Sequence, residues 1–171
     1  ELEGIQLWLN LPAKDKMMTP NYQHLEAAQI PTITSEDQKT KLHIIAGDQK
    51  GEKGLIKTQT EVNVFTAEVD ANGQLEVDLP EPHQSIVYLL EGSIIINGSE
   101  VLHTGEYQMI TFNQDGNAIQ IVAKTTSTLL ILSGAPINEK VTQYGPYVMN
   151  TQTEILEAMR DYQQGKMGYL Y

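Results

Sequence analysis

The feature that most constrains the fold is a series of short apolar stretches separated by tight-turn dipeptides. Asn72-Gly73, Asn97-Gly98 and Asp115-Gly116 each lie between segments that are rich in Ile, Leu and Val. Asn-Gly and Asp-Gly favour tight turns, because both residues of each pair tolerate positive φ. The pattern predicts about nine short strands, at a spacing that is typical of a β-sandwich or a small β-barrel.

Most of the predicted strands lie in the middle of the chain, and two hairpins are predicted among them, one at Asn72-Gly73 and one at Glu91-Gly92. The glycine-rich, charged segment 47–54 is interpreted as an exposed loop. The strands are predicted over residues 41–46, 61–70, 74–79, 85–90, 93–96, 106–112, 118–123 and 128–133.

A further strand is predicted at residues 4–11, where apolar and polar side chains alternate around Trp8. Such an apolar strand needs neighbours on both sides, and no preceding segment offers a hairpin partner. We therefore expect its partners to belong to a half of the protein that this chain lacks. Residues 12–21 are interpreted as a connector, and residues 22–29 as one or two helical turns that Pro31 ends.

One helix is predicted, near the end of the chain. Thr151 and Glu154 have the spacing of a capping box. Ile155, Met159 and Tyr162 recur at the spacing of one helix face, and Gly165 supplies a stop.

Two long stretches of the sequence resemble the pirin family. The first is GIQLWLNLPAKDKM at residues 4–17, followed by residues 20–25. The second includes GAPINE at 134–139, QYGPYVMNT at 143–151, and residues 161–168. Pirins are bicupins, and the resemblance implies a first barrel that binds one iron, or a related divalent metal, through three His and one Glu.

The resemblance predicts an all-β protein: a cupin jelly-roll β-barrel with one C-terminal α-helix. We expect residues 1–30 to be the closing strand of a missing N-terminal cupin plus a linker. Residues 31–150 would form a degenerate C-terminal cupin barrel, and residues 151–171 the helix and tail. Residues 9–17 and 132–141 are also similar to each other, which duplication and shared loop chemistry explain equally well.

The family's metal ligands would lie upstream of this chain. In the present barrel, counting back from Gly92, the glutamate position of a cupin metal site falls at Gln84. The two histidine positions fall at Pro80 and Asp78. Gln is a poor metal ligand, and the side chain of Pro has no atom that can bind a metal. Residues 105–122, which include the later strand, contain no His. We therefore expect iron, or a similar divalent metal, only in the missing N-terminal half, and no cofactor in this chain.

His83, next to Pro82 and Glu81, is interpreted as a remnant ligand, a general base or a polar residue at the barrel mouth. Together with Asp78, Pro80 and Gln84 it would line a degenerate cupin pocket. No catalytic residue and no metal-binding residue is predicted.

The charge balance excludes some partners. The 11 basic and 22 acidic residues give a formal net charge of −11, which argues against binding to nucleic-acid phosphates or to anionic membranes. The absence of cysteine excludes thiolate metal sites and cysteine nucleophiles, and is compatible with a cytoplasmic location, or a nuclear one in a eukaryote.

Three functions remain open from the sequence. The chain is predicted to be a non-catalytic module that supports the metal-bearing cupin and contacts proteins. Alternatively, it is part of a quercetin 2,3-dioxygenase whose catalytic residues lie upstream, or part of a regulator that acts by protein binding. The expected partners are the N-terminal cupin half, a second copy in a homodimer or domain-swapped pair, and another protein.

Overall fold

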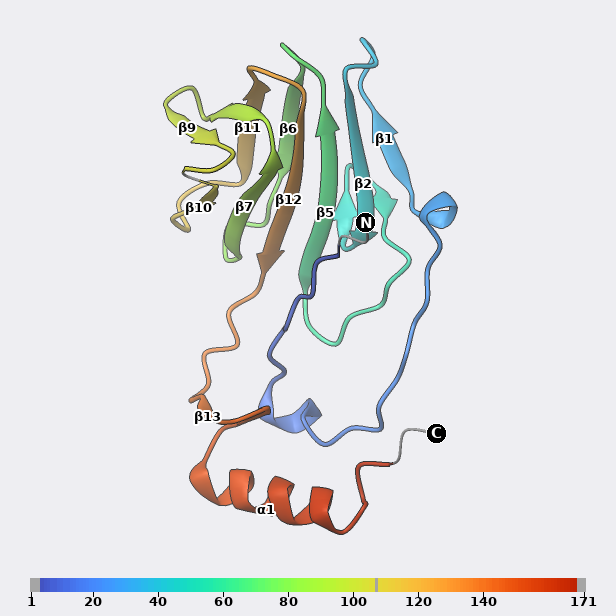
Figure 1. The fold of residues 1–171 in the computed structure, drawn as a ribbon, viewed down its shortest axis with the longest axis vertical. Coiled ribbons are helices and arrows are strands. Elements are labelled where there is room, and N and C mark those ends of the chain that lie inside the picture. The colour runs from blue at the N-terminus through green and yellow to red at the C-terminus, as the bar shows by residue number, and fades with distance from the viewer. Residues whose placement is uncertain (1–3, 107, 169–171) are drawn as a thin grey trace. The chain divides into compact units, whose positions relative to one another are not determined.

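The computed structural model describes residues 4–106 and 108–168, and Figure 1 shows its strands arranged in two main antiparallel sheets. The all-β prediction with one C-terminal helix is confirmed. Residues 1–3 and 107, and residues 169–171 of the predicted tail, lie outside the described residues.

The larger sheet has the order β1 (Thr32–Thr34), β2 (Thr40–Ala46), β5 (Val62–Val69), β12 (Ser127–Gly134), β7 (Gln84–Glu91) and β10 (Met109–Thr111). The smaller sheet has the order β6 (Gln74–Asp78), β11 (Ala118–Ala123), β8 (Ser93–Ile96) and β9 (Glu100–His103). Two short hairpins are β3 (Asp48–Gln49) with β4 (Glu52–Lys53), and β13 (Thr142–Tyr144) with β14 (Tyr147–Met149). The helices are η1 (Ala13–Asp15), η2 (Ala27–Gln29) and α1 (Gln152–Gln163).

The core lies between the two main sheets. Apolar side chains at alternate positions are buried there, because successive strand residues face opposite sides of a sheet. Phe65 on β5 pairs with Ile131 on β12, and both are fully buried. Val77 and Ile121 contribute from the smaller sheet. Burial of each such side chain stabilises the fold by about 1.5–3 kcal/mol.

Two predicted hairpins are wrong, although their turns are present. Asn72 adopts φ +63°, as the turn prediction requires, but β5 and β6 belong to different sheets. The same holds for β7 and β8, on either side of Gly92. A turn dipeptide reverses the chain locally, whereas burial of the apolar faces decides which strands pair. These turns therefore pass the chain from one sheet to the other, as in a jelly roll.

Two local predictions are refined and one is wrong. Residues 47–54 contain the short β3–β4 hairpin, most of whose residues are exposed, and residues 22–29 contain one helical turn, η2. Residues 4–12 form no strand. A strand requires a hydrogen-bonded neighbour, and the described residues provide none for this segment.

The chain divides into two compact units, Asn21–Pro136 and the combination of Glu1–Pro20 with Ile137–Tyr171. The first unit holds both main sheets and the core. In the second unit, α1 contacts the β13–β14 hairpin. Its predicted capping box is confirmed, because Thr151 accepts from the Glu154 N–H and Glu154 accepts from the Thr151 N–H.

Within α1, Ile155 and Ala158 are buried, whereas Tyr162 is exposed. Tyr162 is therefore not part of the packed face that the helical spacing indicated. The β13–β14 hairpin, which pairs Tyr144 with Tyr147, precedes α1 and is absent from the predicted strands. Among the described residues, no helix has the length and apolar character needed to cross a membrane.

Candidate functional site

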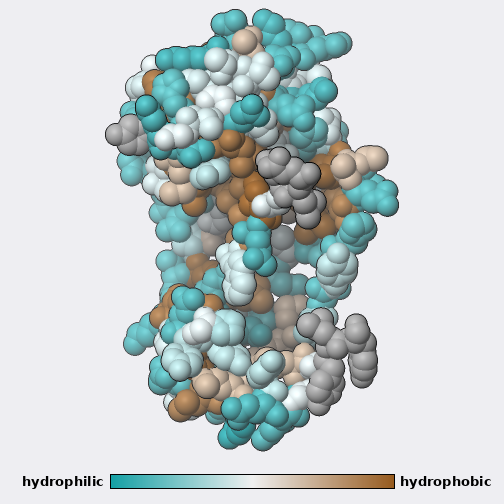
Figure 2. All heavy atoms as spheres, viewed as in Figure 1, coloured by the Kyte–Doolittle hydropathy of each residue, from teal (hydrophilic) through white to brown (hydrophobic). Residues whose placement is uncertain are grey.

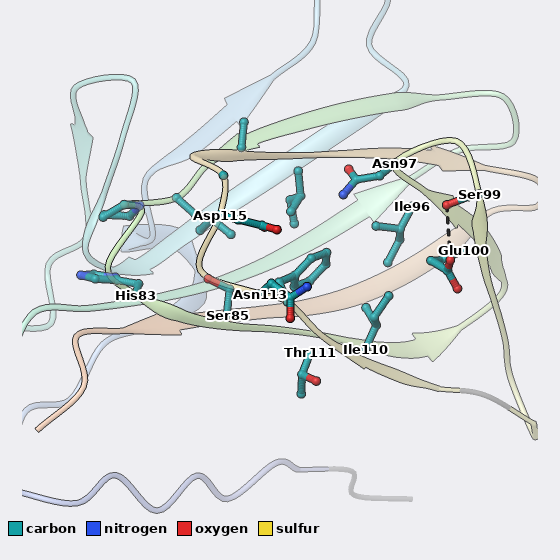
Figure 3. A pocket seen from close by; sticks show the side chains of 16 residues that line it. His83, Ser85, Ile96, Asn97, Ser99, Glu100, Ile110, Thr111, Asn113 and Asp115 are labelled. Atoms are coloured by element: carbon teal, nitrogen blue, oxygen red, sulfur yellow. Dashed lines mark hydrogen bonds between the residues drawn. The ribbon is translucent and has the colours of Figure 1, made fainter. Parts of the chain in front are cut away.

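A cavity of about 300 Å³ opens at one end of the two-sheet unit. It lies where the β6–β7 loop and the β10–β11 loop meet the β8–β9 turn (Figure 3). Its apolar lining includes Leu79, Ile96, Ile110, Phe112 and Ile119. Its polar and charged lining comes from His83, Ser85, Asn97, Ser99, Glu100, Thr111, Asn113 and Asp115.

The structure brings only two of the four predicted pocket residues to this cavity. Pro80 and His83 line it, whereas Asp78 and Gln84 are exposed and do not. Strand alternation explains the difference. Val77 and Leu79 are buried on either side of Asp78, and Ser85 is buried next to Gln84, so the side chains of Asp78 and Gln84 point away from the core.

His83 lies in a buried polar network at the edge of the cavity. Its side chain is 3% exposed, and its Nδ1 lies 3.1 Å from the Ser133 Oγ. The same Oγ accepts a hydrogen bond of 2.9 Å from the Asn63 Nδ2. Ser133 and Asn63 are themselves buried, so a substrate cannot reach this serine. The network therefore connects β5, β12 and the β6–β7 loop structurally.

The other ring nitrogen of His83 is less well satisfied. Nε2 is buried without a hydrogen-bond partner among the described residues. The carboxylate of Glu61, 87% exposed, lies 3.8 Å away, beyond hydrogen-bond distance. Sequence reasoning did not find Ser133 or Asn63, because they are 50 and 20 residues from His83 and no motif connects them.

The backbone of Asp78 is hydrogen-bonded to the side chain of Gln49. The buried side-chain amide of Gln49, oriented to match donors with acceptors, donates to the Asp78 carbonyl and accepts from the Asp78 N–H, both at 3.0 Å. On its other side β6 pairs with β11, Asp78 opposite Ala118. Gln49 therefore satisfies the backbone at the open edge of β6, which is a structural role.

The charged groups of the cavity do not form a metal centre. In the described part of the chain, no three His, Asp or Glu side chains are placed to share a metal ion. The carboxylates that line the cavity belong to Glu100 and Asp115. Ser99 Oγ donates to the Glu100 Oε1 at 3.3 Å. The geometry thus offers a small, partly apolar pocket with acidic groups.

Comparison with protein families identifies the chain. Residues 64–168 match the model of the pirin C-terminal cupin domain. The chain belongs to the pirin family. A pirin-like protein from Solanum lycopersicum is 34% identical over 169 residues, which cover 98% of this chain and 57% of that protein. Mouse pirin is 30% identical over 168 residues, covering 97% of this chain and 57% of that protein.

Solved structures share the fold of this chain. A quercetin 2,3-dioxygenase from Acinetobacter baumannii superimposes with a TM-score of 0.87 at 33% identity, over 96% of this chain and 56% of that one. A second structure of the same description and organism, 17% identical, gives a TM-score of 0.81. The chain thus spans little more than half the length of these relatives.

Proposed function

We propose that this pirin chain acts as a non-catalytic cupin that supports a metal-bearing first cupin and offers contacts to other proteins. The observation that carries the proposal is the state of the three positions at which a metal-binding cupin has its ligands. Asp78 and Gln84 point to solvent, and Pro80 has no ligand atom. A metal needs several donors that converge on one point, and these three residues do not converge.

The proposal is tested by metal analysis of the purified chain. The chain is incubated with Fe(II), Ni(II) or Mn(II), desalted and analysed by mass spectrometry of the elements. Substoichiometric metal is expected in every case. One equivalent of any of the three, lost on mutation of His83 to Ala with retention of the fold, would overturn the proposal.

The second candidate function is that this cupin forms part of a two-cupin quercetin 2,3-dioxygenase. The high structural similarity to an enzyme of that name favours it. In this version the catalytic metal and its ligands belong to the first cupin, and the present cupin closes or stabilises that site. Quercetin consumption by the two cupins together, with iron bound, is the measurement. No turnover by the iron-loaded protein would exclude this function.

The segment before η1 supports a role in contacts. Trp8 is 71% exposed, and Ile5, Leu7 and Leu9 are exposed as well. Hydrophobic residues also lie among hydrophilic ones on the side of the molecule drawn in Figure 2. Monomeric proteins rarely expose many large apolar side chains together. We propose that the first cupin packs against this segment. In a homodimer or a domain-swapped pair, a second copy of the chain would take the place of the first cupin.

Sedimentation of the isolated chain over a wide concentration range separates these arrangements. A dimer is expected in the absence of the first cupin, and Trp8→Ala should weaken it. A monomer at every concentration would contradict the proposed contact. The formal charge of −11 further predicts that any additional protein partner has a basic surface and binds less tightly as salt increases.

A further inference from the structure

The cavity at the end of the two-sheet unit carries charge of one sign. Glu100 and Asp115 contribute carboxylates, and no Lys or Arg is among its lining residues, all of which lie in the described part of the chain. The net charge of the whole chain has the same sign. A phosphate or carboxylate ligand would therefore be repelled, whereas a cation would be attracted.

The two carboxylates lie apart, not in a cluster. Figure 3 shows Glu100 beside Ser99 at one end of the cavity and Asp115 toward the end that holds His83. Asp115 lies on the β10–β11 loop and Glu100 begins β9. Two anionic groups at opposite ends match a ligand that carries a positive group at each of its own ends.

Part of the surface between the two carboxylates is apolar. Ile96 and Ile119 are buried core residues, and Ile110 and Phe112 pack against the same core. Methylene groups gain from contact with such a surface, and an aromatic ring attracts an ammonium group at its face. The volume of about 300 Å³ is at the lower end for small-molecule sites, so only a short ligand fits.

We propose that this cavity binds a small aliphatic diamine. One ammonium group pairs with Asp115 and the other with Glu100, and the methylene chain lies along Ile110 and Phe112, which are partly exposed. This inference does not depend on a metal or on the first cupin, because every group that it uses belongs to this chain.

Calorimetric titration of the full 171-residue chain tests the ligand class with three probes of similar length: putrescine, butanediol and succinate. Saturable binding of one putrescine is expected, with weaker or undetectable binding of the neutral diol and none of the dianion. Added salt should weaken putrescine binding, because both carboxylates are exposed. Absence of putrescine binding, or equal binding of butanediol or succinate, would overturn the proposal.

Charge-removing variants test the location. Asp115→Asn and Glu100→Gln are each expected to lower putrescine affinity about threefold to fivefold, as for other exposed ion pairs. Glu36→Gln, in the loop between β1 and β2, removes one charge outside the cavity and should change nothing. Thermal melting checks that each variant is folded. If one of the two cavity variants does not fold, the other still tests the location of the site. Equal weakening by Glu36→Gln would show attraction to the net charge only and would refute the site.

Discussion

The carboxylate of Glu139 accepts a hydrogen bond of 2.8 Å from the backbone N–H of Ala13, across 126 residues of sequence. The same oxygen, Oε2, accepts a bond of 2.7 Å from the Asn150 Nδ2. One side chain thus connects the first residue of η1 with the residues that lead into α1. The contact also joins the two similar stretches 9–17 and 132–141, since Ala13 and Glu139 each belong to one of them.

Glu139→Ala should loosen the segment around η1. Both donors would lose a charged acceptor, and the expected cost is about 1 kcal/mol, because the site is exposed and water replaces part of the bond. Hydrogen exchange at the Ala13 amide should become faster. Glu157→Ala on α1, which removes the same group from an exposed position, is the control, and equal acceleration in both variants would contradict this role.

Thr151→Ala should destabilise α1 by about 1 kcal/mol, because the N-cap side chain satisfies the Glu154 N–H at 3.3 Å. The measurement is helical circular dichroism during thermal melting. Thr153→Ala makes the same chemical change inside the helix, where no cap is lost, and should be neutral or slightly stabilising. A similar loss in both variants would show that the cap is not the cause.

The helix should also respond to acid. Hydrogen bonds from the backbone N–H groups of Asn150 and Thr151 hold the pKa of Glu154 below its ordinary value, and the bond from Asn150 has the larger effect. A carboxylate with a lowered folded-state pKa stabilises the fold fully above its unfolded-state pKa, which is about 4.3 for glutamate. That stability is lost as the pH falls through the lower folded value.

Helical signal from α1 should therefore decrease in acid below about pH 4. Glu154→Gln keeps an acceptor for the capping box but cannot titrate, so the variant should lack the Glu154 part of this decrease. Identical pH profiles for the two proteins would show that Glu154 does not control it.

Ser133→Ala should cost about 1–3 kcal/mol, because it leaves the His83 Nδ1 and the Asn63 Nδ2 buried without their common partner. Ser85 lies opposite Ser133 in the β7–β12 pairing and is also buried. It has no side-chain hydrogen bond among the described residues, so Ser85→Ala should cost less. Chemical denaturation measures both, and a larger effect of Ser85→Ala would contradict the network.

Gln49→Leu should destabilise the end of β6. The variant keeps an apolar side chain of similar size but leaves the N–H and carbonyl of Asp78 without partners, at an expected cost of about 1–3 kcal/mol. Hydrogen exchange at the Asp78 amide should rise together with the loss of stability. Gln74→Leu, on the exposed face of β6, is the control and should leave the Asp78 amide protected.

The sequence alone determined the elements that depend on neighbouring residues. The apolar stretches at residues 61–70 and 128–133 predicted two central strands, and the Thr151–Glu154 spacing predicted the start of α1. These signals are local, because side-chain periodicity and capping involve residues within a few positions of one another. The family resemblance added the cupin fold, which strand periodicity leaves open.

Only the tertiary structure decided which strands pair, where the side chains point and what surrounds them. Asn72-Gly73 specifies a turn, but not that β5 and β6 enter different sheets. Counting positions placed Gln84 in a pocket, yet the alternation of β7 turns it to solvent and leaves His83 with Ser133, 50 residues away. Such contacts form when distant apolar faces are buried together, and no short sequence pattern encodes that choice.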